Sequence, residues 1–270
     1  MAKIESALWD IGHLDTLSYR ETPLHHLDPR TKLLTTLLFI VTVVSFPKSE
    51  VSALLPLVIY PVALIAVGNL PAGCLLKKMA LVAPFAFLIG IFNPLFDRVV
   101  VLHLGPIAIT GGWVSFASIM IRFALTVVAA LILIASTGLN GVCLGLEKMG
   151  VPSIFAVQLL FLYRYVFVLI DESLRLVRAH SLRSFDGKGK GMKIFGQLVG
   201  QLLLRTIDRA QRIHLAMVCR GFEGEIRLLR PLKIRSADIG FFFMWGAFFA
   251  LVRFWNIPQS LGHLAVEGMG

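Results

Sequence analysis

Long apolar runs recur along this chain and constrain its fold more than any other feature. Each run has 14 to 26 residues, and short polar or glycine-containing stretches separate them, including an expected loop at residues 97–110 and an expected glycine-rich connection at residues 138–150. Pro84 and Pro94 are expected to break the third run. They cover residues 33–46, 51–67, 79–96, 112–137, 151–170 and 239–252. A membrane-spanning helix needs about 17–25 apolar residues. Asp28 and Pro29 form a helix-start signal that extends the first run to about 18 residues. We expect an all-α, polytopic membrane protein.

The composition excludes several other classes of protein. Apolar residues make up 57% of the chain, charged residues 16%, and the mean hydropathy is +0.79. Soluble domains average about 25% charged residues. A soluble enzyme, a disordered chain and a collagen are therefore excluded. The cysteines Cys74, Cys143 and Cys219 are scattered singly, a spacing that favours neither a disulfide framework nor zinc.

The positive charge is concentrated in one segment. The chain has a net charge of +10, and residues 171–238 hold 14 of the 26 basic residues and seven acids, which gives +7. Cytoplasmic loops of membrane proteins carry an excess of Lys and Arg. We therefore expect residues 171–238 to face the cytoplasm.

The smaller charged turns predict the topology. With the N-terminus inside the cell, Lys48 lies outside, Lys77 and Lys78 inside, Arg98 outside and Lys148 inside. A full crossing by residues 151–170 would then place the basic segment outside, against the rule. We expect that run to lie at the cytoplasmic surface, where its Arg164 is tolerated. The chain divides into a cytoplasmic segment (1–28), transmembrane helices (29–150), interfacial and cytoplasmic helices (151–238) and a last span with the C-terminus (239–270).

The basic segment has the pattern of a helical hairpin. Residues 171–183 contain no Gly or Pro and extend the preceding helix, and residues 184–193 form a glycine-rich turn. Residues 194–220 form a second helix. Its Arg205, Arg209 and Arg212 share one face.

A short motif is repeated at the two helix ends, 37 residues apart. The first tip, residues 183–187, reads Arg183-Ser184-Phe185-Asp186-Gly187, and the second tip, residues 220–224, reads Arg220-Gly221-Phe222-Glu223-Gly224. Arginine at a helix C-terminus complements the helix dipole, which is one explanation. That effect does not require the repeated Phe-acid-Gly. Two matched tips indicate two matched receptors, such as a partner dimer whose pockets bind arginine through carboxylates.

These residues resemble the transmembrane T component of energy-coupling-factor (ECF) transporters, in the cobalt/nickel branch of the CbiQ type. The family's tip motif is Ala-Arg-Gly or Ala-Arg-Ser, and Leu182 and Cys219 stand here in place of its alanines. The order of parts agrees along most of the chain. The matching stretches are Pro23-Leu24-His25-His26-Leu27-Asp28-Pro29-Arg30-Thr31-Lys32-Leu33 and Ala216-Met217-Val218-Cys219-Arg220-Gly221-Phe222.

The resemblance implies a non-enzymatic coupling subunit in the bacterial cytoplasmic membrane. Its partners would be two ABC ATPase subunits that bind ATP and Mg²⁺, a metal-capturing S component and a small accessory membrane subunit. The implied docking residues are Arg183, Ser184, Arg220 and Gly221, supported by Phe185, Phe222, Ala216 and Met217. The substrate would be cobalt, with nickel or a vitamin as alternatives.

Several other motifs could indicate a nucleotide site, a metal site or a functional charge in the membrane. The lysine-glycine stretch 187–191 lacks the spacing of a phosphate-binding loop and follows no strand, so we expect no cofactor in this chain. His25 and His26 have no flanking ligands at metal spacing, so we expect a structural role and no metal site. Arg122 and Arg164 lie in apolar runs, where a functional role is one explanation and an interior ion pair or snorkelling near a helix end is the other. Asn93 and Pro94 are candidates for contact with the S component.

Two rival classes remain as alternatives. A membrane enzyme needs paired carboxylates or a nucleophile set, and the apolar runs contain no Asp or Glu. A protein whose basic helices bind nucleic acid or anionic lipid would not need an acidic residue in each tip. We expect contact with the lipid bilayer and no nucleic-acid partner.

Overall fold

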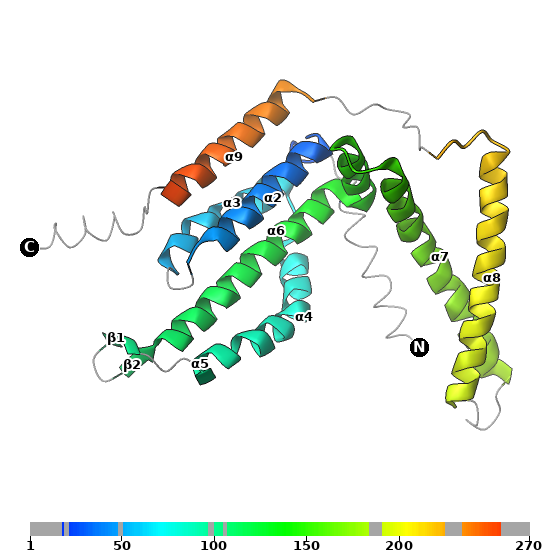
Figure 1. Cartoon of the computed structure of the whole chain (residues 1–270), viewed down its shortest axis with the longest axis horizontal. Coiled ribbons are helices and arrows are strands. Elements are labelled where there is room, and N and C mark those ends of the chain that lie inside the picture. The colour runs from blue at the N-terminus through cyan, green and yellow to red at the C-terminus, as the bar shows by residue number, and fades with distance from the viewer. Residues whose placement is uncertain are drawn as a thin grey trace, which may run out of the picture. The chain divides into compact units, whose positions relative to one another are not determined.

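The computed structural model describes residue 18 and residues 22–47, 51–96, 100–104, 107–183, 191–224 and 234–254. Helices dominate these residues (Figure 1). The chain divides into two compact units. One unit contains residues 146–231, and the other contains residues 12–145 and 232–270. The predicted all-α class is confirmed.

The first helix of the larger unit begins where the sequence predicts. Helix α2 spans Pro29–Ser45, and the Asp28 side chain accepts a hydrogen bond from the Arg30 backbone N–H at its start. Proline is suited to the first helical position because its fixed φ is helical and its missing N–H would have no partner there. The second apolar run is less regular, because two 3₁₀ turns, η1 (Ser52–Leu54) and η2 (Pro56–Val58), precede α3 (Ile59–Gly68).

An aromatic cluster forms the core of this unit. The ring centroids of Phe39 in α2 and Tyr60 in α3 are 4.5 Å apart, and Tyr60 lies 4.8 Å from Trp245. Trp245 and Phe249 belong to α9 (Ser236–Phe254), which lies beside α2 in Figure 1. Burial of such rings, with added edge-to-face contacts, stabilises the packing of the first and last helices.

The third apolar run was expected to break at Pro84, but the helix is not interrupted there. Helix α4 (Ala72–Gly90) continues through Pro84, and α5 (Phe92–Phe96) follows as a separate turn that contains Pro94. Residues 97–110 were expected to form a loop, but they include an antiparallel hairpin. Its strands are β1 (Val100–Leu104) and β2 (Ile107–Thr110). Valine and isoleucine favour such strands.

Helix α6 extends beyond its expected end. It spans Gly111–Lys148, although residues 138–150 were expected to be a glycine-rich connection. Its backbone is non-helical only at Gly138, where φ is 68° and ψ is 157°. Glycine adopts this conformation without a Cβ penalty, so the helix kinks and then resumes.

The smaller unit is the predicted helical hairpin. Helix α7 (Ser153–Arg183) is continuous and is followed by α8 (Met192–Val218), which packs against it. Arg205 Nη1 donates a hydrogen bond to Glu172 Oε1 across the pair, at 2.6 Å. Residues 184–190, where the turn and most of the first tip were predicted, lie outside the described residues.

Four helical segments in the described residues are long and apolar enough to cross a membrane. They are Ala72–Pro94, Gly111–Lys148, Ser153–Arg183 and Ser236–Phe254. Helix α2 has 17 residues, and Ser52–Gly68 is a shorter apolar segment. The chain is a multi-pass membrane protein.

Candidate functional site

The second tip is a tight, hydrogen-bonded helix end. The Gly221 N–H donates to the Val218 carbonyl at 2.9 Å, and the Phe222 N–H donates to the Met217 carbonyl at 3.1 Å. This pair of bonds is the Schellman motif. Gly221 has a φ of +78°, which L side chains rarely adopt. The arginine-glycine order in the motif thus has a local reason: glycine lets the chain reverse directly after Arg220.

The two tip arginines lie at opposite ends of the hairpin. Arg220 follows the end of α8, whereas Arg183 is the last residue of α7, and both are exposed. Phe222 at the second tip contacts Phe161 on α7, 22 residues before Arg183. At 1.5 Å per residue, the two tips are separated by about 33 Å along α7. Ser184 and Phe185 of the first tip lie outside the described residues.

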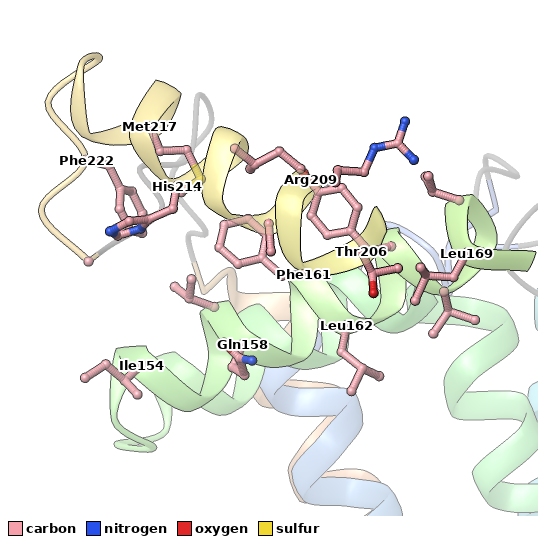
Figure 2. A pocket seen from close by; sticks show the side chains of 17 residues that line it. Ile154, Gln158, Phe161, Leu162, Leu169, Thr206, Arg209, His214, Met217 and Phe222 are labelled. Carbon is pink, nitrogen blue, oxygen red and sulfur yellow. The ribbon is translucent and has the colours of Figure 1, made fainter. Parts of the chain in front are cut away.

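The residues expected to support docking point in different directions. Ala216 is exposed, but Met217 and Phe222 are half-buried and turn toward α7. The ring centroids of Phe222 and Phe161 are 6.5 Å apart. Figure 2 shows Met217, His214 and Phe222 together at one end of a groove. In this structure Phe222 therefore contacts the neighbouring helix of its own chain.

This groove between α7 and α8 has a volume of about 670 Å³. Apolar side chains dominate its walls, and the exceptions are Gln158, Thr206, Arg209 and His214. No sequence motif indicates the groove, because its two walls come from helices that meet only when the hairpin folds.

A polar junction lies at the start of α2 and α9, and we define it as Asp28, Lys32 and Asp238. Asp238 is 1% exposed. Its Oδ1 accepts from the Asp28 N–H at 2.8 Å, and its Oδ2 accepts from the Arg235 N–H at 2.7 Å. Asp238 thereby caps its own helix and joins it to Asp28, which lies 210 residues earlier and caps α2. Asp238 was not among the predicted site residues, although an aspartate in the first turn of the last span is a signal that could have indicated it.

Lys32 completes the junction at the kink of α6. Its Nζ donates to the Ser136 carbonyl at 3.1 Å and to the His25 carbonyl at 3.4 Å. Asp28 and Asp238 both interact electrostatically with it. The stretch that carries the family resemblance, from His25 to Lys32, therefore has a structural role here: it caps helices and joins α2, α6 and α9.

Arg122 is also used internally. Its Nη2 donates to the Pro47 carbonyl at 2.7 Å, just beyond the end of α2. The guanidinium of Arg253 lies 5.1 Å from the centroid of the Phe46 ring, beside the same helix end. Arg122 thus has a structural hydrogen bond to a backbone carbonyl near a helix end, which is closer to the snorkelling explanation than to an interior ion pair. Arg164 is exposed on α7, and both of its explanations remain open.

The histidine pair does not form a metal centre with its described neighbours. His25 Nδ1 lies 2.6 Å from Thr22 Oγ1, and His26 is exposed. Within the described part of the chain, no three His, Cys, Asp or Glu side chains gather as metal ligands. Asn93 and Pro94 lie in α5, half-buried.

Comparisons with known proteins find relatives that are similar over most of this chain. An uncharacterized protein of Methanocaldococcus jannaschii is 29% identical over 231 residues, which cover 81% of this chain and 77% of the relative. The ECF transporter transmembrane protein EcfT of Heliobacterium modesticaldum is 29% identical over 257 residues, 87% of this chain and 94% of the relative. The cobalt transport protein CbiQ of Rhodobacter capsulatus is 28% identical over 195 residues, 70% and 75% of the two chains.

The family-level match covers both units of the chain. The model of the CbiQ family, described as cobalt transport protein, matches residues 20–230. This range includes the helix-start stretch from His25 to Lys32 and both arginine tips. The chain therefore belongs to the CbiQ family of cobalt transport proteins.

Proposed function

We propose that this chain is the membrane-embedded coupling subunit of an ECF-type importer for cobalt ions. The observation that carries the proposal is the second tip, where a tight helix end presents Arg220 to solvent. An exposed guanidinium at a fixed turn is suited to bidentate pairing with a carboxylate of a partner protein. We assign that partner as an ABC ATPase subunit, which binds the ATP and Mg²⁺.

The distance between the tips supports two ATPase subunits. Arg183 and Arg220 are about 33 Å apart along α7, too far for one pocket to bind both. Each arginine would dock in the equivalent groove of one ATPase. Movement of the two ATPases relative to one another would then act on the two ends of the α7–α8 hairpin. That movement would reach the S component, which captures the ion.

Contacts in the larger unit support a cytoplasmic position for the hairpin. The Asp28–Asp238 hydrogen bond joins the starts of α2 and α9, so both helices would enter the membrane from one surface. Gly145, near the end of α6, packs against the start of α2; an added Cβ would lie 2.9 Å from Leu33 Cδ1. The end of α6 and the start of α9 would therefore lie at the same membrane surface.

If α6 ends and α9 starts at the same surface, the segment between them crosses the membrane an even number of times. Helix α7 is apolar enough to span, but it can cross only if α8 crosses back. Helix α8 is not among the apolar candidates and carries Arg205, Arg209 and Arg212. Charged side chains at a bilayer centre are costly. We infer that neither helix crosses, and the positive-inside rule assigns their side as cytoplasmic.

The substrate follows from the family and not from a site in this chain. The family description and the Rhodobacter capsulatus relative both carry the words cobalt transport. Relatives named EcfT carry no metal in their names, so nickel or a vitamin remains the alternative. Copurification of the assembled complex followed by mass spectrometry would identify the S component and with it the substrate.

The docking proposal is tested by the double variant Arg183→Ala/Arg220→Ala. We expect normal membrane insertion, loss of copurifying ATPase subunits and loss of cobalt uptake. Removing one partner of a buried interface pair costs about 2–5 kcal/mol, so two losses abolish a stable complex. Arg212→Ala is the matched control, since Arg212 is exposed on α8 away from the tip. Normal copurification and uptake by the double variant would refute docking through these arginines.

The topology is tested by labelling of an introduced cysteine. Gly191 precedes α8 and is exposed, so Gly191→Cys in a background without Cys74, Cys143 and Cys219 provides one reporter. We expect a membrane-impermeant maleimide to label it only after the cells are opened. Labelling from outside intact cells would show that the assigned side is wrong.

A further inference from the structure

Phe222 links the second tip to a different helix. Schellman turns commonly include an apolar contact back to their own helix, and Met217 is the residue in that position. Phe222 also reaches α7, where its ring faces Phe161 at a centroid distance of 6.5 Å and an angle of 52°. Both rings line the α7–α8 groove (Figure 2). The residue two positions after the arginine is thus anchored on the neighbouring helix.

The anchor limits how the tip can move. Gly221 lies between Arg220 and Phe222, and an added Cβ there would meet no atom within 4 Å. Packing against the Cβ side of Gly221 therefore does not restrain the turn. The hydrogen bonds to Val218 and Met217 hold the turn to α8, and the contact of Phe222 with Phe161 holds it to α7.

We propose that Phe161 is a positioning residue for the Arg220 anchor. By holding Phe222, it fixes the direction in which Arg220 leaves the hairpin, and it transfers force from Arg220 to α7 as well as α8. This inference rests on the proposed docking role of Arg220 and adds a residue 59 positions away in sequence to it. A pre-oriented side chain binds more tightly because less conformational freedom is lost on binding.

The test measures association of the purified ATPase subunits with the full chain in nanodiscs. We expect Phe161→Ala and Phe222→Ala each to weaken association roughly 2- to 10-fold, the range expected for loss of one aromatic pair. Phe161→Leu, which keeps an apolar side chain in the groove, should recover part of the loss. Phe155→Ala is the matched control, because Phe155 is also on α7, is 62% exposed and does not line the groove.

The decisive measurement repeats Phe161→Ala in an Arg220→Ala background. If Phe161 acts through Arg220, it has no further effect once the guanidinium is absent. An equal loss in both backgrounds, or no loss in either, would overturn the positioning role. If Phe161→Ala proves too unstable to purify, Phe222→Ala in the two backgrounds gives the same comparison at a residue of the turn itself.

The same data separate this inference from the proposed function. If Arg220→Ala leaves association unchanged, the docking role fails, and the positioning role fails with it. If Arg220→Ala weakens association while Phe161→Ala matches Phe155→Ala, docking stands and only the positioning role is wrong. Melting temperatures of all variants are compared in parallel. A fall in melting temperature for Phe161→Ala with unchanged association would assign the ring pair to stability alone.

Discussion

The polar junction and the second tip both have charged residues at helix ends, but the junction buries its charged side chain and the tip exposes it. At the junction, Asp238 is 1% exposed and both of its carboxylate oxygens accept backbone N–H groups. At the tip, the backbone groups bond to one another and Arg220 is exposed. A charge that is satisfied within the chain holds helices together, whereas a charge left at a fixed turn is available to a partner.

Two charged residues at helix ends, both in stretches that carry the family resemblance, have different roles. Asp28 and Arg220 belong to the two stretches that carry the family resemblance. Asp28 caps α2 and donates its backbone N–H to Asp238, so it serves the membrane unit. Arg220 lies within a turn whose hydrogen bonds do not involve its side chain. Substitutions at the two regions should therefore separate stability from partner binding.

The largest effect is expected for Asp238→Ala. It removes the acceptor of two backbone N–H groups, and each unsatisfied buried donor costs about 1–3 kcal/mol. We expect a loss of about 3 kcal/mol, seen as a melting temperature lowered by about 6–12 °C in detergent. Asp238→Asn keeps one acceptor oxygen and should be intermediate.

Asp238→Ala should not change the affinity for the ATPase subunits. Per folded molecule, Asp238→Ala is expected to bind the ATPase subunits like the unsubstituted chain, because Arg220 is untouched. A normal melting temperature combined with lost ATPase binding would reverse the roles assigned to the two regions.

Local signals predicted most of the fold, and long-range contacts account for what was missed. Asp28-Pro29 predicted the start of α2, and the small residue after Arg220 predicted a helix end, since both signals act within one turn. Asp238 was missed because its partner is 210 residues away. Phe222 was assigned to the partner interface because nothing in its neighbourhood indicates Phe161.

The helix boundaries show the same limit. Residues 138–150 were expected to be a connection because they are rich in glycine, yet α6 continues to Lys148. Gly145 allows a close approach between helices, because an added Cβ would lie 2.9 Å from Leu33 Cδ1 of α2. At Gly141 an added Cβ would lie 2.9 Å from Thr137 Cγ2 of the same helix. Glycine at a packing contact and glycine in a loop look alike in one sequence.

A smaller effect is expected for Gly221→Ala, which sharpens the comparison at the tip. The φ of +78° disfavours alanine by about 1 kcal/mol, while no neighbouring atom obstructs its Cβ. We expect weaker ATPase association with little change in melting temperature. Gly200→Ala within α8, also unobstructed, is the control and should stabilise the helix by about 0.5–1 kcal/mol. Equal behaviour of the two variants would show that the turn geometry does not matter for docking.

The smallest effect is expected at the bridge between α7 and α8. The side chains of Arg205 and Glu172 are 57% and 21% exposed, so their ion pair is worth about 0.2–1 kcal/mol. Glu172→Arg and Arg205→Glu should each lower the melting temperature slightly through like-charge repulsion. The exchanged pair should recover the original value, because two solvated side chains can swap roles. The junction has no such freedom: the partners of Asp238 are backbone N–H groups, which only an acceptor can satisfy. Failure of the exchanged pair to recover would mean that this bridge is as restrictive as the junction, and that the hairpin is held by specific geometry and not only by charge.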